Sequence, residues 1–297
     1  MQLSGSAREW HQMFKLPEIQ GHICPKEYKD VIYFSCDYEY FYKHGYALAK
    51  SIFGTIGWIH VHIHIINEGN IDHAVLKEFT KLHSFTYTWE DIDPQFYIAL
   101  PKRLHQMRDG YSIFNIADPD YVARRTYLAS VRFMRLPQLF KHEDTHVLQI
   151  DCDSILRTAF HQSTFRELAK HVGVMPKPKD PATFIASAVT LGTGPIGLEF
   201  RELFATRLIE GFEKGCYWYI DQHVLKDVMK EWKVVRNKPH NNIPFKWNCW
   251  GIKKDDIFST GKGNKKETTK YRAAQLKWLP NDLYHAAIAE IKAKNGS

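Results

Sequence analysis

The first third of the chain contains three short apolar runs, each typical of a buried strand. They alternate with two stretches in which apolar residues recur at helical spacing. The predicted strands are residues 31–34, 58–66 and 84–88, and the predicted helices cover residues 41–52 and 75–82. This alternation predicts an α/β fold in which helices flank a mostly parallel central sheet. Ligands of such sheets bind at the carboxyl ends of the strands.

A fourth apolar run, residues 147–150, ends abruptly in Asp151-Cys152-Asp153. If the strand continues through this tripeptide, side chains alternate, so Asp151 and Asp153 share one face and Cys152 points the other way. Two carboxylates on one face suit a hard divalent cation such as Mg2+ or Mn2+. The same residues also fit a polar strand-to-turn transition in which an aspartate caps the next helix.

A long helix is predicted to begin after Asp118 and to stop before Pro137, following a turn-rich connection over residues 89–117. Arg125 and Arg132 lie seven residues apart on this helix and therefore share a face, with Arg135 close by. This face is either a solvated basic surface or, at Arg132, a contact for an anion near the two aspartates.

The second half of the chain is less regular. The pattern predicts a helix after Asp153 that contains Phe160 and Phe165, a loop at 177–181, a strand at 183–191, and helices at 200–212 and 281–294. Another helix begins near Asp221-Gln222, where Asp221 has a simple alternative explanation as an N-cap.

A loop rich in glycine and lysine spans residues 258–266. The backbone amides of Gly261 and Gly263, with lysine ammonium groups nearby, are suited to wrap a diphosphate. A flexible basic surface loop is the alternative interpretation.

Three histidines, His60, His62 and His64, alternate with aliphatic residues and are predicted to lie on one strand face. They are candidates for a zinc site. On a single central strand, packed and hydrogen-bonded histidines are the more common arrangement.

Composition restricts the class of protein. The 297 residues are 44% hydrophobic and 14% aromatic, which suffices for one large domain. Five scattered cysteines suggest free thiols in a reducing compartment. With no secretion signal and no apolar stretch near the roughly 20 residues of a membrane span, we expect a soluble, cytoplasmic protein. The net charge of +7 permits a polyanionic partner, but no nucleic-acid-binding motif is present.

Taken in order, these segments resemble the GT-A fold of nucleotide-sugar glycosyltransferases. The resemblance is to the retaining group that includes glycogenin and the bacterial galactosyltransferases of lipopolysaccharide synthesis, and it covers roughly residues 30–266. It rests on Ser35-Cys36-Asp37-Tyr38, on residues 127–140 with Arg132, on residues 147–154, on Asp221-Gln222 and on the basic glycine loop.

The resemblance implies a role for each matching position. Asp151 and Asp153 would hold Mn2+ or Mg2+, and Asp37 and Tyr38 would bind the nucleoside. The remaining donor contacts would come from Arg132, Gly261, Lys262 and Lys265, and Asp221 and Gln222 would lie near the transferred sugar as candidate catalytic residues.

Two positions depart from the pattern of these glycosyltransferases. Their closing loop begins with a histidine that is a third metal ligand, and Phe258, which cannot coordinate a metal, stands near the corresponding place. Their Asn-Ala-Gly type segment corresponds to Ala186-Ser187-Ala188 in this chain. We therefore expect differences in the metal shell and in the contacts to the sugar.

The leading hypothesis is a single-domain, metal-assisted glycosyltransferase that moves a sugar from a nucleotide diphosphate to a glycan, lipid or protein acceptor, with retention. A nucleotide-binding half (30–153), an acceptor and sugar half (154–266) and a C-terminal helical extension (267–297) are expected within this domain. The alternatives are a nucleotidyltransferase, which releases pyrophosphate, and a non-enzymatic basic protein that binds nucleic acid.

Overall fold

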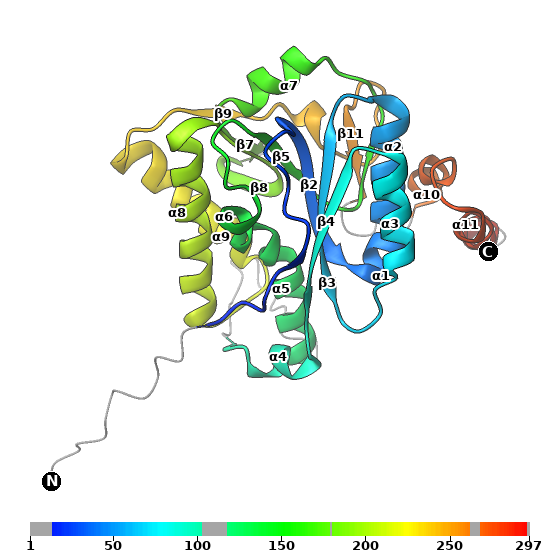
Figure 1. Cartoon of the computed structure of the whole chain (residues 1–297), viewed down its shortest axis with the longest axis horizontal. Coiled ribbons are helices and arrows are strands. Elements are labelled where there is room, and N and C mark those ends of the chain that lie inside the picture. The colour runs from blue at the N-terminus through cyan, green and yellow to red at the C-terminus, as the bar shows by residue number, and fades with distance from the viewer. Residues whose placement is uncertain (1–13, 103–117, 179, 262–267, 296–297) are drawn as a thin grey trace, which may run out of the picture.

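An eight-stranded mixed sheet forms the centre of the molecule in the computed structural model, which describes residues 14–102, 118–178, 180–261 and 268–295 (Figure 1). The strand order is β1-β4-β3-β2-β5-β8-β7-β9. These strands are β1 (Gln20–Gly21), β2 (Asp30–Asp37), β3 (His60–Asn67), β4 (Phe85–Asp91), β5 (His146–Ile150), β7 (Val172–Lys177), β8 (Asp180–Leu191) and β9 (His240–Asn242).

The four neighbouring strands β4, β3, β2 and β5 run parallel to one another, whereas β8 pairs with β5 and with β7 in antiparallel fashion. The predicted opening order of strand, helix, strand, helix and strand is confirmed, and so is the α/β fold class. Strands from both proposed halves of the chain, such as β5 and β8, hydrogen-bond to each other in this one sheet.

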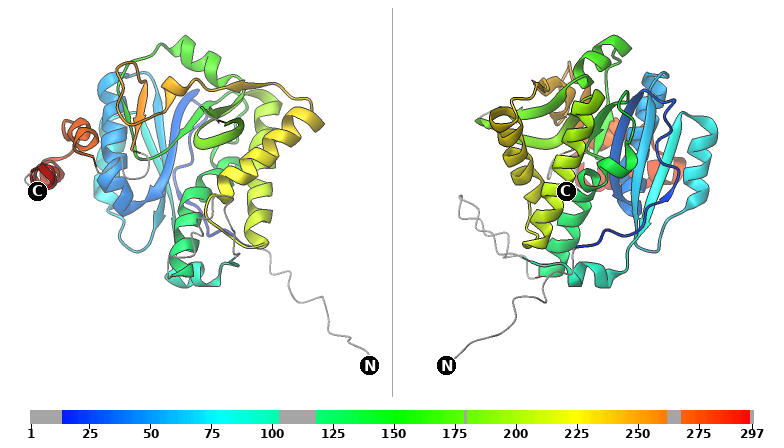
Figure 2. Two further views of the ribbon diagram at one scale, coloured as in Figure 1. Left: turned by 180° about the vertical axis from the view of Figure 1, so that it is seen from behind. Right: turned by 60° about the vertical axis from the view of Figure 1, so that its left-hand side comes forward.

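Helices cover both faces of the sheet (Figures 1 and 2). One layer contains α5 (Pro119–Met134), α6 (Leu136–Leu139), α8 (Gly194–Glu213), α9 (Ile220–Lys230) and η3 (Glu231–Val235), with α4 (Pro94–Ala99) beside it. The other contains α1 (Tyr38–Tyr40), η1 (Phe41–Gly45), α2 (Tyr46–Thr55), α3 (His73–Leu82) and α7 (Gln162–Ala169). The helices α10 (Thr269–Leu276) and α11 (Asn281–Asn295) lie outside the second layer.

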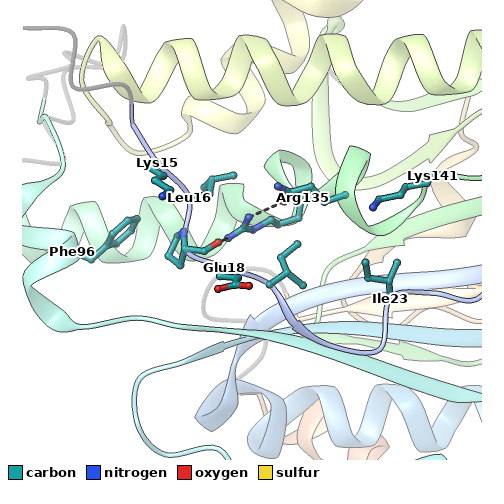
Figure 3. A pocket seen from close by; sticks show the side chains of 10 residues that line it. Lys15, Leu16, Glu18, Ile23, Phe96, Arg135 and Lys141 are labelled. Atoms are coloured by element: carbon teal, nitrogen blue, oxygen red, sulfur yellow. Dashed lines mark hydrogen bonds between the residues drawn. The ribbon is translucent and has the colours of Figure 1, made fainter.

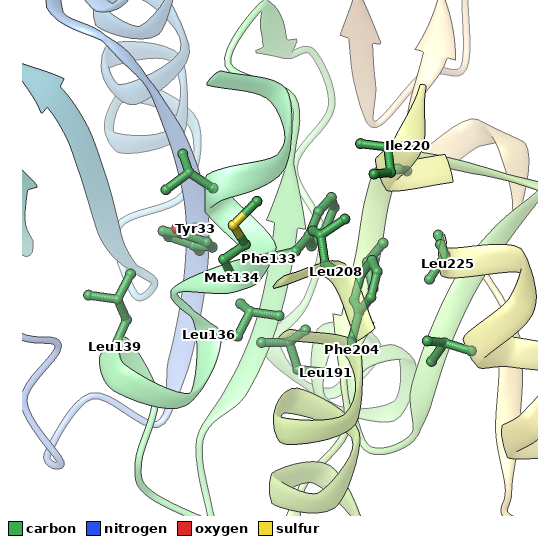
Figure 4. Packing of buried hydrophobic residues seen from close by; sticks show 14 of the residues in the cluster. Tyr33, Phe133, Met134, Leu136, Leu139, Leu191, Phe204, Leu208, Ile220 and Leu225 are labelled. Atoms are coloured by element: carbon green, nitrogen blue, oxygen red, sulfur yellow. The ribbon is translucent and has the colours of Figure 1, made fainter. Parts of the chain in front are cut away.

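The alternating side chains of β2 separate two hydrophobic clusters. Val31 and Tyr33 belong to the cluster under α5, α8 and α9, part of which is drawn in Figure 4. Ile32 and Phe34 belong to the cluster under α2 and α3. Because β2 is buried on both faces, it carries a continuous apolar run rather than an alternating one, as the sequence indicates.

The prediction of a helix directly after Asp153 is wrong. Residues Ser154–Leu156 form strand β6, and the helix α7 begins only at Gln162. Strand β6 forms a small second sheet with β11 (Phe258–Thr260) and β10 (Cys249–Trp250). The short helix η4 (Phe245–Trp247) directly precedes β10 in the chain. Pairing with a strand about 100 residues away decides the conformation here, and local sequence carries no sign of such pairing.

Other boundaries also differ from the predicted ones. Strand β4 continues to Asp91, and α4 forms within the region expected to be turns. The predicted loop at 177–181 is largely occupied by the ends of β7 and β8. By contrast, the helix predicted after Asp118 is confirmed, because the side chain of Asp118 caps α5 by accepting hydrogen bonds from the amides of Asp120 and Tyr121. No helix in the described parts of the chain combines the length and apolar character needed to cross a bilayer.

Candidate active site

A cavity of about 610 Å³ opens where the parallel strands β2 and β5 end. The last residues of β2, the turn after β5, one side of α5, the middle of β8 and the start of α9 form its walls. This is the edge at which ligands bind to open α/β sheets. Charged residues of both signs are part of the lining: the aspartates are Asp37, Asp151, Asp153 and Asp221, and the arginines are Arg124, Arg125 and Arg132.

Asp151 and Asp153 lie in a turn that follows β5. The strand ends at Ile150, so the prediction that the strand carries both aspartates is wrong by one to three residues. Neighbouring segments hold the turn: the amide of Asp151 donates to the carbonyl of Ser187 on β8 (3.0 Å), and the amide of Gly261 donates to the carbonyl of Asp153 (2.9 Å). Both carboxylates still line the cavity, because the turn itself forms part of the wall.

Arg132 connects two of the carboxylates. Its guanidinium forms an ion pair with Asp151 and lies 3.6 Å from Asp221 Oδ2, and it also donates to the carbonyl of Ala186 (3.1 Å). Burial acts against the charge of Arg132, but Asp151 and Asp221 outweigh this effect and raise the pKa of Arg132 above its usual value. Arg132 is therefore a permanent cation fixed beside the aspartate turn.

The other end of the cavity is formed by the junction of β2 and α1. Asp37 caps α1 by accepting a hydrogen bond from the amide of Tyr40 (2.7 Å), and Arg124 Nη2 lies 3.5 Å from its second oxygen. Arg124 also forms a two-pronged contact with Glu68 (2.7 and 2.6 Å). Burial raises the pKa of Asp37, whereas the Tyr40 amide and Arg124 oppose that shift.

The start of α9 forms the third wall. Tyr219 precedes this helix with a φ of 71°, and its left-handed backbone turns the chain so that Asp221 and Gln222 line the cavity. Tyr219, not Asp221, is the N-cap residue, so capping does not explain Asp221. Burial raises the pKa of Asp221, and Arg132 opposes the shift.

An aromatic and cationic surface lines part of the cavity and consists of Tyr121 and Arg125 from α5 and of Trp218 just before α9. The Arg125 guanidinium lies 4.6 Å from the ring centre of Trp218 and 5.5 Å from that of Tyr121. Tyr121 is 44% exposed. Contacts of this kind fix the orientation of the rings.

Several solved structures share this architecture at low sequence identity. A bifunctional glycosyltransferase, WbbM, matches over 90% of the chain with a TM-score of 0.57 and 14% identity, and the chain spans about half (53%) of the WbbM chain. The galactosyltransferase LgtC, in complex with donor and acceptor sugar analogues, matches over 86% of the chain and 95% of its own, with a TM-score of 0.51 and 12% identity. The glycosyltransferase GlyE of Streptococcus pneumoniae TIGR4 matches over 90% of the chain and 64% of its own, with a TM-score of 0.51 and 14% identity.

The chain has a GT-A glycosyltransferase fold. The predicted fold family is thereby confirmed. No protein-family model matches the chain, and no curated protein sequence matches it.

Within this GT-A fold, most residues selected from the sequence lie in one cavity: Asp37, Arg132, Asp151, Asp153, Asp221 and Gln222. Tyr38 does not line it, because its ring is buried against Phe41 and Tyr42. Gly261 contacts the cavity only through its bond to the Asp153 carbonyl. Lys262 and Lys265 lie outside the described residues.

Tyr40, Arg124 and Trp218 are among the cavity residues that were not selected as site residues from the sequence. Tyr40 donates from its hydroxyl to Asp153 Oδ2 (2.8 Å) and so links the end of β2 to the aspartate turn. Arg124 contacts Asp37, and Trp218 stacks with Arg125. The spacing of Tyr40 from Asp37, one helical turn, is the one signal that could have indicated its orientation.

The donor atoms of the aspartate turn fit a hard divalent cation in part. Asp151 and Asp153 supply carboxylate oxygens of the kind Mg2+ and Mn2+ prefer. No cluster of three or more His, Cys, Asp or Glu side chains suited to a metal occurs among the described residues. Phe258 is fully buried and packs near Phe160, so it contributes nothing to a metal shell. A cation here would have two protein ligands and would need phosphate or water oxygens for the rest.

The three histidines of β3 bond to the neighbouring strand. His60 contacts Ser84 and Thr86, His62 contacts Thr86 and Thr88, and His64 contacts Thr88 through ring nitrogens at 2.8 to 3.3 Å. Burial lowers the pKa of all three, so they are neutral at neutral pH. In the described part of the chain they form a hydrogen-bonded ladder and not a metal cluster.

A second, open groove of about 720 Å³ lies on another part of the surface, between the segment at residues 15–23 and Arg135 (Figure 3). It shares no lining residue with the cavity at the aspartate turn. Because Asp37, Asp151, Asp153 and Asp221 line the 610 Å³ cavity and not this groove, the site is assigned to the cavity.

Proposed function

We propose that the protein is a glycosyltransferase that moves a sugar from a nucleotide-diphosphate donor to an acceptor hydroxyl. The observation that carries the proposal is that Asp151, Asp153 and Arg132 lie in one cavity with Asp37 and Asp221, at the carboxyl edge of a GT-A sheet. A diphosphate needs cations at one point and a nucleoside needs hydrogen-bonding groups at another. The cavity offers both.

Unsatisfied polar atoms in the cavity walls support the binding of a polar ligand. The hydroxyls of Ser130 and Ser187 and the Nε atom of Arg132 are buried without a hydrogen-bond partner among the described residues. Buried polar groups in folded proteins are nearly always paired. A donor bearing hydroxyl and phosphate oxygens would supply the missing partners once the walls shift to expose these atoms.

We place the donor along the length of the cavity. The nucleoside lies near Asp37, Tyr40 and Arg124, and the diphosphate lies beside Arg132 and the aspartate turn. Asp151 and Asp153 would hold Mn2+ or Mg2+, and such a cation, when bound, neutralises charge that builds on the departing diphosphate. Arg132 supplies a fixed positive charge for the same purpose and does not have to reorganise during transfer.

Asp221 and Gln222 are placed beside the transferred sugar. Asp221 is held by Arg132, so its carboxylate is oriented before the sugar binds. We propose that transfer proceeds with retention, which is the outcome implied by the resemblance to the retaining group. The anomeric configuration of the product, read by NMR, tests this point: an inverted product would assign Asp221 the role of a general base.

The acceptor is placed against Trp218, Tyr121 and Arg125. Exposed aromatic faces bind the apolar faces of sugar rings and offer large contact area at low conformational cost. This surface adjoins Gln222, next to which the donor sugar is placed.

The test combines binding and turnover. In a thermal-shift screen of nucleoside diphosphates and their sugars, with and without Mn2+, the nucleotides of one base should raise the Tm of the protein. A ligand that binds only the folded state stabilises that state. Asp153→Asn should abolish the Mn2+-dependent part of this shift and the release of nucleoside diphosphate. The matched control is Asp144→Asn, whose side chain is 63% exposed and pairs with Lys29 on the surface.

The products separate the competing enzyme class. A nucleotidyltransferase releases pyrophosphate, whereas a glycosyltransferase releases the nucleoside diphosphate. A flat thermal response to every nucleotide, or full turnover in Asp153→Asn, would contradict the proposal.

A further inference from the structure

Two thiols meet at the floor of the cavity. The Sγ atoms of Cys36 and Cys152 are 3.2 Å apart, and both residues are only 5% exposed. Both nevertheless line the cavity, so a small molecule that enters it reaches their surroundings. All five cysteines of the chain are free thiols.

The sheet register brings this pair together. Strands β2 and β5 are parallel, and their last paired residues are Tyr33 and Gln149. Three residues further along each chain stand Cys36 and Cys152, so the two thiols continue the same register beyond the last hydrogen-bonded pair. Pairing of the strands, and not chance contact between loops, sets their separation.

Each thiol is bonded through the backbone to residues of the proposed donor site. Cys36 immediately precedes Asp37, and Cys152 stands between Asp151 and Asp153. The far side of Cys152 is closed by η1: a Cβ atom added to Gly45 would lie 2.8 Å from Cys152 Sγ. Movement of the Cys152 sulfur is therefore blocked toward η1 and open toward Cys36.

We propose that Cys36 and Cys152 form a reversible modification site, in which a disulfide rearranges the aspartate turn and blocks the cavity. A disulfide has an S–S distance of about 2.05 Å, so the sulfurs must approach by about 1.1 Å. One bond forms between the sulfurs and two S–H bonds break. The two electrons and two protons pass to a two-electron oxidant such as a peroxide, which becomes two hydroxyl-bearing products.

We expect the turn that contains Cys152, and not strand β2, to move when the two sulfurs approach each other. Cys36 belongs to the buried central strand β2, whereas Cys152 lies in a turn held by a few hydrogen bonds. Displacing Cys152 displaces the aspartates on either side of it, which changes the contact of Asp151 with Arg132 and that of Asp153 with Tyr40. Both contacts contribute to the geometry on which the proposed donor site rests.

The experiment treats the full chain with diamide, a two-electron thiol oxidant that is reduced to a hydrazine, and maps disulfides by mass spectrometry under non-reducing conditions. We expect one cross-linked peptide pair joining Cys36 to Cys152, lighter by two hydrogen atoms and restored by dithiothreitol. Cys36→Ser and Cys152→Ser should each remove it. Cys216→Ser, which alters a buried cysteine outside the cavity, should retain it.

Hydrogen exchange of the peptide containing residues 150–155 tests the rearrangement without any ligand. Faster exchange in the oxidised protein, reversed by reduction and absent from oxidised Cys36→Ser, is expected. A cross-link between other cysteines, no cross-link in the folded protein, or a cross-link without any change in exchange would each overturn the proposal.

The effect on sugar transfer rests on the proposed function and is read separately. Oxidation should remove the nucleotide-dependent rise in Tm that the reduced protein shows. If the reduced protein shows no such rise, the proposed function is wrong. The cross-link and exchange results still test whether Cys36 and Cys152 form a reversible disulfide that rearranges the turn.

Discussion

A buried charge cluster at Glu90 permits a quantitative test of what holds the sheet to its helical layer. Glu90 on β4 is fully buried, and its carboxylate accepts hydrogen bonds from Arg135 Nε (2.8 Å) and from the hydroxyl of Tyr127. His64 Nε2 lies 3.3 Å from the same carboxylate. Arg135 also donates to the carbonyl of Pro17 and so ties the N-terminal segment to the cluster.

The perturbation is Glu90→Gln, which keeps the size of the side chain and removes its charge. The guanidinium of Arg135, with a side chain only 1% exposed, then remains buried without its counter-ion. Breaking a buried pair from one side costs about 3–5 kcal/mol. At about 2 °C per kcal/mol for a large domain, the Tm should fall by roughly 6–10 °C.

The effect should depend on pH in a defined way. Burial acts to raise the pKa of Glu90, but His64 and Arg135 outweigh it and hold the pKa below its ordinary value of 4.5. A lowered folded-state pKa contributes stability that is complete above the unfolded pKa and is lost as the pH falls through the folded pKa. The difference between wild type and Glu90→Gln should therefore be full at neutral pH and shrink below pH 4.5.

Equilibrium unfolding in urea, followed by circular dichroism, measures the loss, with a double variant as the control. Glu90→Gln combined with Arg135→Met removes both charges and should be less destabilised than the sum of the two single variants. A Glu90→Gln protein within about 1 kcal/mol of wild type at neutral pH, or strictly additive single variants, would refute the reasoning.

Two further substitutions address the proposed acceptor surface and the packing behind the aspartate turn. Trp218→Ala removes the ring that stacks with Arg125. We expect the KM for the acceptor to rise roughly 2- to 12-fold, from about 0.5–1.5 kcal/mol of aromatic contact, with little change in the KM for the donor. A change confined to the donor KM would contradict the placement of the acceptor. Gly45→Ala puts a methyl group 2.8 Å from both Cys152 Sγ and the Phe41 ring. It should destabilise the protein by about 1–3 kcal/mol in the same unfolding assay. An unchanged midpoint would contradict this, because it would mean that the neighbouring side chains move aside without loss of stability.

Much of the fold could be predicted because its central strands carry strong local signals. Strands β2, β3 and β5 are buried on both faces. Strand β2 carries a continuous apolar run, and β3 and β5 are rich in Val, Ile and Leu although His and Gln residues interrupt them. The start of α5 is similarly local, since Asp118 followed by Pro119 is a capping pattern. Strands β6 and β11 have three residues each and pair across about 100 residues, so nothing in either segment distinguishes it from a loop.

The site, like the fold, could be predicted only where the local sequence determines the position of a residue. The sequence indicates that Asp37, Asp151 and Asp153 end strands, and strand ends of a parallel sheet meet at one edge. It does not indicate which tyrosine after Asp37 faces that edge, because this depends on where α1 begins. In the structure Tyr40 contacts Asp153 and Tyr38 is buried elsewhere. The placement of Asp221 and Gln222 depends on the left-handed residue Tyr219, and a tyrosine in that conformation is rare enough that sequence patterns do not foresee it.

The burial of β2 on both faces determines how the protein unfolds. Its side chains belong alternately to two hydrophobic clusters, and each cluster includes helices from only one layer. Neither layer can detach without exposing one face of this strand to water. We therefore expect the amides of Val31 to Phe34 to be among the slowest to exchange, and to open only when the whole sheet unfolds, so that the two layers behave as one cooperative unit.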